Sequence, residues 1–147
     1  MSIREQVKGL AATYGTRDPF ELCRMLGIIV SIRDIGRFRG YCINHKGVSA
    51  ITVSGRLPEV VAVFVCAHEL AHALLHRRFN RVFMDTFTRS NSGRYEREAD
   101  KFAALLLYSE QPPFAEQVIT AEEMANCLSV GVDTVSERLA ELGIGGE

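Results

Sequence analysis

Two histidines and a glutamate stand close together near the middle of the chain, in the sequence His68-Glu69-Leu70-Ala71-His72. Histidines four residues apart project from the same face of an α-helix, about one turn from each other, so both imidazoles can reach one tetrahedral Zn²⁺. Glu69 follows the first histidine and can act as general base for a water molecule that attacks a peptide carbonyl. The pattern therefore predicts a hydrolytic zinc site, with His68 and His72 as ligands and Glu69 as the catalytic residue.

A catalytic zinc site also needs a third protein ligand and an open fourth position. The metzincin pattern places a histidine six residues after the second motif histidine, with a glycine between them, but this chain has Leu75 and Arg78 there. The other source is a carboxylate from a second helix. Glu96 and Asp100 lie four residues apart, so Glu96 can bind the metal while Asp100 bonds the far nitrogen of a ligating histidine. Glu98 points about 200° away around that helix and is the weaker candidate for the ligand.

His76 continues the helix face of the two motif histidines, but it lies about 12 Å from His68 along the helix axis. It cannot share the metal with both of them, and we expect it to line the cleft or to have a structural role. A competing interpretation needs no metal, since the motif histidines could be core residues while Glu96 and Glu98 belong to a solvated face. It would leave three polar side chains without partners on one buried apolar helix, which is costly, so the zinc interpretation is preferred.

The elements that position these residues follow from hydrophobic periodicity and turn signals. A long, strongly apolar helix is predicted over residues 57–78, around the His-Glu motif, and a second helix over residues 94–108. β-Branched residues predict strands at 28–35, 39–44 and 48–54, the last two joined by a tight hairpin turn, and we expect a small three-stranded antiparallel sheet. Further helices are expected at residues 3–14, 20–26, 121–128 and 133–142. The fold class is therefore α+β.

Length and composition indicate one soluble globular domain. The 147 residues suffice for a single core, with residues 1–110 as the catalytic core and 111–147 as a C-terminal helical extension. The four cysteines lie singly, which favours reduced thiols in a reducing compartment. The polar start does not resemble a signal peptide, and the longest apolar run, Val60–Ala67, is too short to span a bilayer. We expect a cytoplasmic protein without a membrane partner.

The two motif helices resemble those of the ImmA/IrrE family of bacterial and phage metallopeptidases. The matching stretches are Val65–His76, which contains HELAHALLH, and Glu96–Leu106, which reads EREADKFAALL. The hairpin before the first helix and the short helices after the second also follow the family layout. The family usually continues its second helix with LLMP, whereas this chain reads LLYS at residues 106–109, so the exit from that helix differs.

This resemblance implies a zincin-like fold with Zn²⁺ held by His68, His72 and Glu96, and with Glu69 as the base, the gluzincin type of metallopeptidase. It also implies a partner, because family members typically cleave a helix-turn-helix repressor encoded beside them in a phage or mobile element. Only the resemblance indicates this protein substrate. The residue that would stabilise the transition state stays open among three candidates: Tyr41, Tyr95 and His76.

Residues 125–139 have the spacing of a helix-turn-helix, with a small alanine, a Ser-Val-Gly turn and apolar positions in the second helix. A DNA-binding regulator is therefore the alternative function, and a non-catalytic zinc-binding interaction protein is a third. Charge argues against the regulator. Residues 1–109 hold 16 Lys/Arg and 10 Asp/Glu, a net of +6, whereas residues 110–147 hold one arginine and eight acids, a net of −7. Phosphate would repel a recognition helix in such a segment, so direct nucleic-acid binding is not expected.

Overall fold

The computed structural model describes residues 1–77, 93–108 and 120–127. In these ranges the chain forms five helices and three strands, in the order α1 (Ile3–Tyr14), α2 (Pro19–Leu26), β1 (Ile29–Arg33), β2 (Gly40–His45), β3 (Val48–Ser54), α3 (Glu59–Leu75), α4 (Gly93–Leu107) and α5 (Ala121–Cys127). No helix in the described ranges is long and apolar enough to cross a membrane. The helix expected over residues 133–142, and with it the helix-turn-helix pairing, lies outside the described residues.

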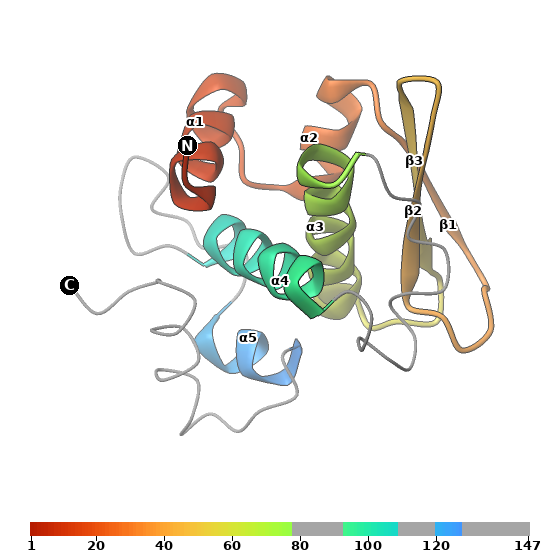
Figure 1. Ribbon diagram of the computed structural model, residues 1–147. Coiled ribbons are helices and arrows are strands. Elements are labelled where there is room, and N and C mark those ends of the chain that lie inside the picture. Colours follow the sequence, from red (N-terminus) through yellow and green to blue (C-terminus); the bar gives the residue numbers. More distant parts are fainter. Residues whose placement is uncertain (78–92, 109–119, 128–147) are drawn as a thin grey trace.

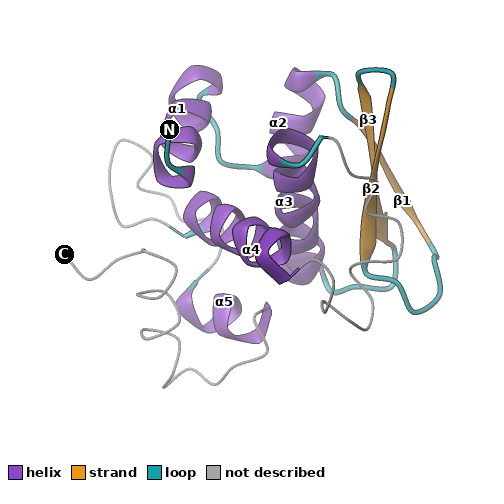
Figure 2. Cartoon of the chain, in the orientation of Figure 1, coloured by secondary structure: helices purple, strands orange, loops and turns teal. Residues whose placement is uncertain are grey.

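Helix α3 is the centre of the arrangement. Figure 1 shows it standing between the sheet on one side and α1 and α4 on the other, and Figure 2 shows the same division by element type. It packs against α2, α4, α5, β2 and β3. Ten consecutive residues, from Phe64 to Ala73, are buried, because neighbours cover this helix on several sides. The expectation of a central buried helix is confirmed, although α3 begins and ends two to three residues inside the predicted range.

The sheet is mixed, not antiparallel as the sequence led us to expect. Its strand order is β1-β3-β2, with β3 parallel to β1 and antiparallel to β2. Residues 34–39 carry the chain past the end of the sheet, so β1 and β2 become the outer strands and β3 fills the gap between them. The predicted hairpin turn is confirmed, since Lys46 and Gly47 both have positive φ between β2 and β3, as a two-residue turn of this kind requires.

A glycine allows the sheet to approach α3 closely. A Cβ atom on Gly40, the first residue of β2, would lie 2.6 Å from Val65 Cγ1 and 2.9 Å from the backbone oxygen of Thr52. Both distances are well inside van der Waals contact, so a larger residue would push β2 and α3 apart. The same Cβ would lie 3.5 Å from Glu69 Cγ. The close approach therefore occurs at the turn of α3 that carries the candidate catalytic glutamate.

The end of α4 is held by a residue from the N-terminal part of the chain. Arg17, which lies between α1 and α2, donates hydrogen bonds from Nη1 to the backbone oxygens of Leu105 and Leu106, at 3.1 and 3.2 Å. The last four carbonyls of a helix lack intrahelical partners, and cationic side chains stabilise that end. The last turn of α4 has no basic residue of its own, so Arg17 supplies the missing donor.

Candidate metal centre

Three side chains converge where α4 crosses α3. His68 Nε2 lies 2.9 Å from Glu96 Oε1, and His72 Nε2 lies 3.1 Å from Glu96 Oε2. The two Nε2 atoms are 3.2 Å apart. All three side chains are buried, and they are the group within the described residues whose ligand atoms could hold a metal ion, all within 4.8 Å of one another. The structure thus brings together the two motif histidines and the carboxylate that the sequence analysis preferred.

The spacing of these atoms fits a tetrahedral metal. Zinc binds histidine nitrogen and carboxylate oxygen at about 2.0–2.1 Å, which places two ligand atoms of a tetrahedron about 3.3 Å apart. The two histidine nitrogens, 3.2 Å apart, are close to that value, and each of them lies 2.9 or 3.1 Å from a different oxygen of the Glu96 carboxylate. Electron-rich atoms facing one another in a buried site repel unless a cation or protons lie among them. The donor set of two imidazoles and one carboxylate therefore suits Zn²⁺.

Asp100 fixes the orientation of the first histidine. Its Oδ1 lies 2.9 Å from His68 Nδ1, and its side chain is 2% exposed. A carboxylate accepts, so His68 Nδ1 carries a proton, and a neutral His68 would then offer its Nε2 lone pair to a metal ion. Asp100 lies one turn after Glu96 on α4, as the spacing indicated. The structure places its carboxylate beside His68 Nδ1, and its support of a metal ligand stays a prediction.

Glu69 differs from the other acids of the site in its hydrogen bonding. It is fully buried, and neither carboxylate oxygen has a hydrogen-bond partner among the described residues. Glu69 is also absent from the group of converging ligand atoms. A buried carboxylate without partners costs free energy, and a catalytic role is one reason why a protein keeps such a group. This orphaned acid beside His68 fits a proton acceptor for a water or substrate and does not fit a ligand.

His76 and Glu98 do not join the three ligand atoms, but the structure connects them to one another. Leu75 is the last residue of α3, and His76 follows as its C-cap. His76 Nε2 lies 2.7 Å from Glu98 Oε1, and His76 Nδ1 lies 2.9 Å from His72 Nδ1. The sequence analysis named both residues without finding this connection. The four-residue spacing of His72 and His76 is the signal that could have indicated it.

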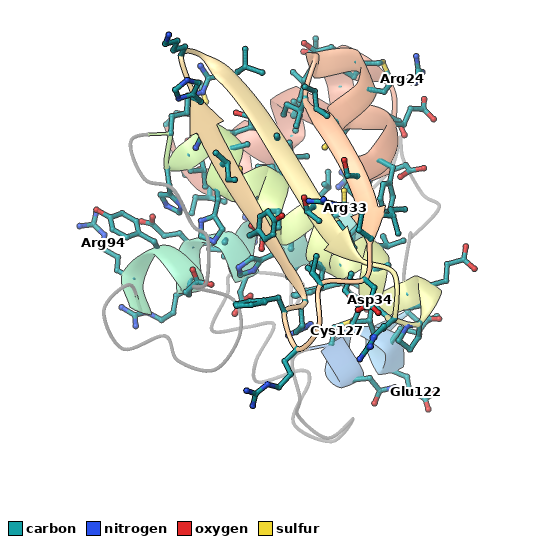
Figure 3. All side chains as sticks on the ribbon, turned by 90° about the vertical axis from the view of Figure 1, so that its right-hand side faces the viewer. Arg24, Arg33, Asp34, Arg94, Glu122 and Cys127 are labelled. Carbon is teal, nitrogen blue, oxygen red and sulfur yellow. The ribbon has the colours of Figure 1, made fainter. Side chains whose placement is uncertain are left out.

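The two candidate tyrosines lie in different places. The Tyr95 ring packs edge-on against the His76 ring, with centroids 4.6 Å apart. Tyr41 is on β2, and its hydroxyl accepts a hydrogen bond from Arg33 Nη2 at 2.9 Å. Figure 3 shows Arg33 on the face of the sheet turned toward the viewer, with α3 behind the sheet. Tyr41 is thus engaged with the outer side of the sheet, whereas Tyr95 lies beside His76.

The cysteines are not part of the site. All four are buried free thiols. A hydrogen bond with Cys23, together with burial, raises the pKa of Cys66 far above its usual range, and burial raises the pKa of Cys127 to about 11. Thiols with raised pKa values stay protonated near neutral pH, whereas metal binding and nucleophilic attack need the thiolate. Cys66 is a core residue, as its position in the sequence indicated.

A helix with two histidines and a glutamate, crossed by a second helix that brings a carboxylate to both imidazoles, has the residues of a metallopeptidase centre. Comparison with known proteins gives the family. The family model for the IrrE N-terminal-like domain, which describes a family of peptidases, matches residues 23–140. The chain therefore belongs to this family. The membership expected from the two sequence motifs is confirmed.

Two relatives extend this finding. The chain is 35% identical over 106 residues to the uncharacterized immunity region protein 2 of Bacillus phage phi105, which covers 71% of this chain and 67% of that protein. It is 24% identical over 146 residues to the metallopeptidase ImmA of Bacillus subtilis strain 168, covering 96% of this chain and 86% of ImmA. The likeness to a metallopeptidase therefore spans nearly the whole chain.

Proposed function

We propose that this protein is a zinc-dependent endopeptidase in which His68, His72 and Glu96 hold the metal. The observation that carries the proposal is the convergence of one buried ligand atom from each residue within 4.8 Å, with the two Nε2 atoms 3.2 Å apart. An acid without a partner among the described residues, Glu69, lies on the same helix turn. Family membership supports a peptidase, because the geometry alone would fit any hydrolytic zinc site.

Each residue has a separate part in the proposed reaction. Zinc, when bound, supplies a Lewis acid that makes water more acidic and polarises a peptide carbonyl. Glu69 accepts the proton of the attacking water and later passes it to the leaving amine, as a general base and then a general acid. Asp100 holds the proton of His68 on Nδ1, so that Nε2 would have its lone pair available to bind the metal. Glu96 adds a negative charge that offsets part of the charge of the cation.

The proposed substrate is a specific helix-turn-helix repressor, encoded beside this protein in a phage or other mobile element. One relative is named for a phage immunity region and the other as a metallopeptidase. A peptidase that removes a repressor would join these two descriptions. Cleavage of a single protein, in contrast to general digestion of peptides, is the outcome that this proposal requires.

We also propose a compartment and a domain organisation for the protein. Four buried thiols suit a reducing compartment, so we place the protein in the cytoplasm. We treat residues 1–147 as one peptidase domain with a catalytic core over 1–110 and an extension over 111–147. Direct DNA binding is not included, because the first turn of α5 carries Glu122 and Glu123 and residues 110–147 have a net charge of −7.

The test is cleavage of the neighbouring repressor by purified protein. Wild type should cut the repressor at a defined position, a strong chelator should abolish cutting, and added Zn²⁺ should restore it. An unrelated helix-turn-helix protein and an unfolded casein serve as control substrates and should remain intact. Cleavage that persists after complete metal removal would refute the zinc mechanism, and equal cutting of all three substrates would refute the specific partner.

A further inference from the structure

Behind His72, on the side away from the converging ligand atoms, two more side chains form a chain of hydrogen bonds. His72 Nδ1 lies 2.9 Å from His76 Nδ1, and His76 Nε2 lies 2.7 Å from Glu98 Oε1. We propose that His76 and Glu98 are positioning residues, which hold His72 in the tautomer that can bind metal through Nε2. The proposal rests on the proposed function, since it concerns a ligand of that metal centre.

The direction of each hydrogen bond follows from the chemistry of its last member. The Glu98 carboxylate can only accept, so the proton of His76 is held on Nε2. His76 Nδ1 then carries a lone pair and accepts, which requires His72 Nδ1 to donate. A neutral His72 with its proton on Nδ1 has its lone pair on Nε2, the atom that faces Glu96 and His68 and that would bind the metal. Glu98 thus sets the tautomer of a ligand through an intervening imidazole.

The surroundings of His76 favour this role over a catalytic one. Its side chain is 3% exposed, and both ring nitrogens are engaged, one with His72 and one with Glu98. The Tyr95 ring packs edge-on against it and limits its rotation. A residue that stabilised a transition state would need a donor directed at the substrate, and neither nitrogen of His76 is available for that. His76 is therefore removed from the candidates for that task.

The two histidine ligands thus receive support by different routes. His68 is bonded directly to the carboxylate of Asp100, whereas His72 reaches the carboxylate of Glu98 only through His76. Glu98 is also the more accessible of the two acids, with 31% of its side chain exposed, and it lies 3.5 Å from the Arg94 guanidinium Nε. A substitution at Glu98 can therefore change the metal centre without opening the core, which makes the proposal testable.

Two pairs of variants separate positioning from simple packing. Glu98→Lys replaces the acceptor by a donor, which forces the His76 proton onto Nδ1 and the His72 proton onto Nε2, where it blocks the metal. Glu98→Gln keeps an acceptor oxygen and should have a smaller effect. His76→Phe keeps a buried ring but removes the acceptor, whereas His76→Asn offers its amide oxygen near the position of Nδ1. Glu59→Lys, at an exposed position on α3, is the control for the same change of charge.

Zinc affinity, measured by chelator competition, is the main readout. Residues that support ligands typically contribute 10–100-fold to metal affinity, so we expect a loss of about that size in Glu98→Lys and His76→Phe. His76→Asn should recover most of it, and Glu59→Lys should bind like wild type. Long-range ¹⁵N–¹H spectra of the metal-free protein should show the His76 proton on Nε2 in wild type and on Nδ1 in Glu98→Lys. The visible spectrum of the Co²⁺-loaded protein should change in the same variants.

The outcomes distinguish this proposal from the proposed function. Equal zinc affinity of Glu98→Lys and Glu59→Lys, or a His76 proton on Nδ1 in wild type, overturns the positioning role. If thermal unfolding shows that His76→Phe does not fold, the two Glu98 variants decide. Failure of folded wild type to bind zinc overturns the metal centre and the positioning role together. Wild type that binds zinc with the predicted dependence on Glu98 but does not cleave the repressor leaves this proposal standing and counts against the substrate alone.

Discussion

Four acidic side chains around the site differ in their partners, and these partners define what each can do. Glu96 faces two imidazole nitrogens, Asp100 and Glu98 each bond one histidine ring, and Glu69 has no partner among the described residues. A carboxylate that accepts strong hydrogen bonds is a poor proton acceptor, because those bonds stabilise its charged form. Of the four, Glu69 is therefore the one suited to general base catalysis.

A first prediction concerns Glu69. Glu69→Gln should fold and bind one equivalent of zinc as tightly as wild type, because Glu69 is not among the proposed ligands. Repressor cleavage should fall by about 10²–10⁴-fold, the usual contribution of a general base. Rates measured at equal zinc loading test this, with Glu21→Gln on the exposed surface of α2 as the control. Cleavage close to the wild-type rate would mean that another group takes the proton.

A second prediction concerns the third ligand. Glu96→Ala should lose zinc, because its carboxylate contacts both histidine nitrogens. Glu98→Ala should keep the metal with reduced affinity. Metal analysis of protein purified without a polyhistidine tag separates the two, with His72→Ala as the reference for loss of a ligand. Full zinc content in Glu96→Ala, together with loss in Glu98→Ala, would transfer the ligand role to Glu98.

Helices were easier to predict than the pairing of strands, because a helix depends on contacts three and four residues apart. The spacing of His68 and His72, and of Glu96 and Asp100, was enough to place each pair on one helix face. The order of the strands depends on β1 pairing with β3, which are separated by β2 in the chain. No local pattern specifies that pairing, so the sequence favoured a simple antiparallel sheet. No glycine or proline marks the end of α3 at Leu75, so the sequence predicts a longer helix. The hydrogen bond between His76 and Glu98 joins two different helical segments, and the sequence analysis did not predict it.

A third prediction belongs to the contact between β2 and α3. Gly40→Ala would place a Cβ atom 2.6 Å from Val65 Cγ1, and overpacking of this kind typically costs about 1–3 kcal/mol of stability. Proteolysis should fall more than zinc affinity, since the displaced turn of α3 carries Glu69. Denaturant unfolding and zinc titration measure the two effects. Gly55→Ala is the matched control, because its Cβ would meet no atom closer than 3.6 Å, and unchanged stability in both variants would contradict the close approach.

The whole molecule has an uneven distribution of charge along the chain. The net charge is +6 over residues 1–109 and −7 over residues 110–147. Charges of opposite sign in separate parts of a molecule can orient a charged partner as it approaches, and salt weakens that attraction. The same asymmetry disfavours DNA as the partner, because the segment that resembles a helix-turn-helix is the acidic one.

A fourth prediction follows from this asymmetry. Cleavage of the repressor at low substrate concentration should slow as ionic strength rises from low to physiological values, because the rate of encounter falls. The maximal rate at saturating substrate should change little. Duplex DNA should not bind the protein with measurable salt dependence. Tight, sequence-selective DNA binding that survives Glu69→Gln and removal of zinc would contradict the peptidase function and favour a DNA-binding regulator.

The contacts of α4 bear on the choice of the N-terminal boundary when a shortened form of the protein is expressed. The match to the family begins at residue 23, inside α2, and a boundary chosen from that match would discard α1 and Arg17. Yet α1 packs on α4, and Arg17 holds the carbonyls at the end of that helix. The helix that presents Glu96 would lose both supports. The folding unit thus begins before the region by which the family is recognised, and expression boundaries should include the first helix.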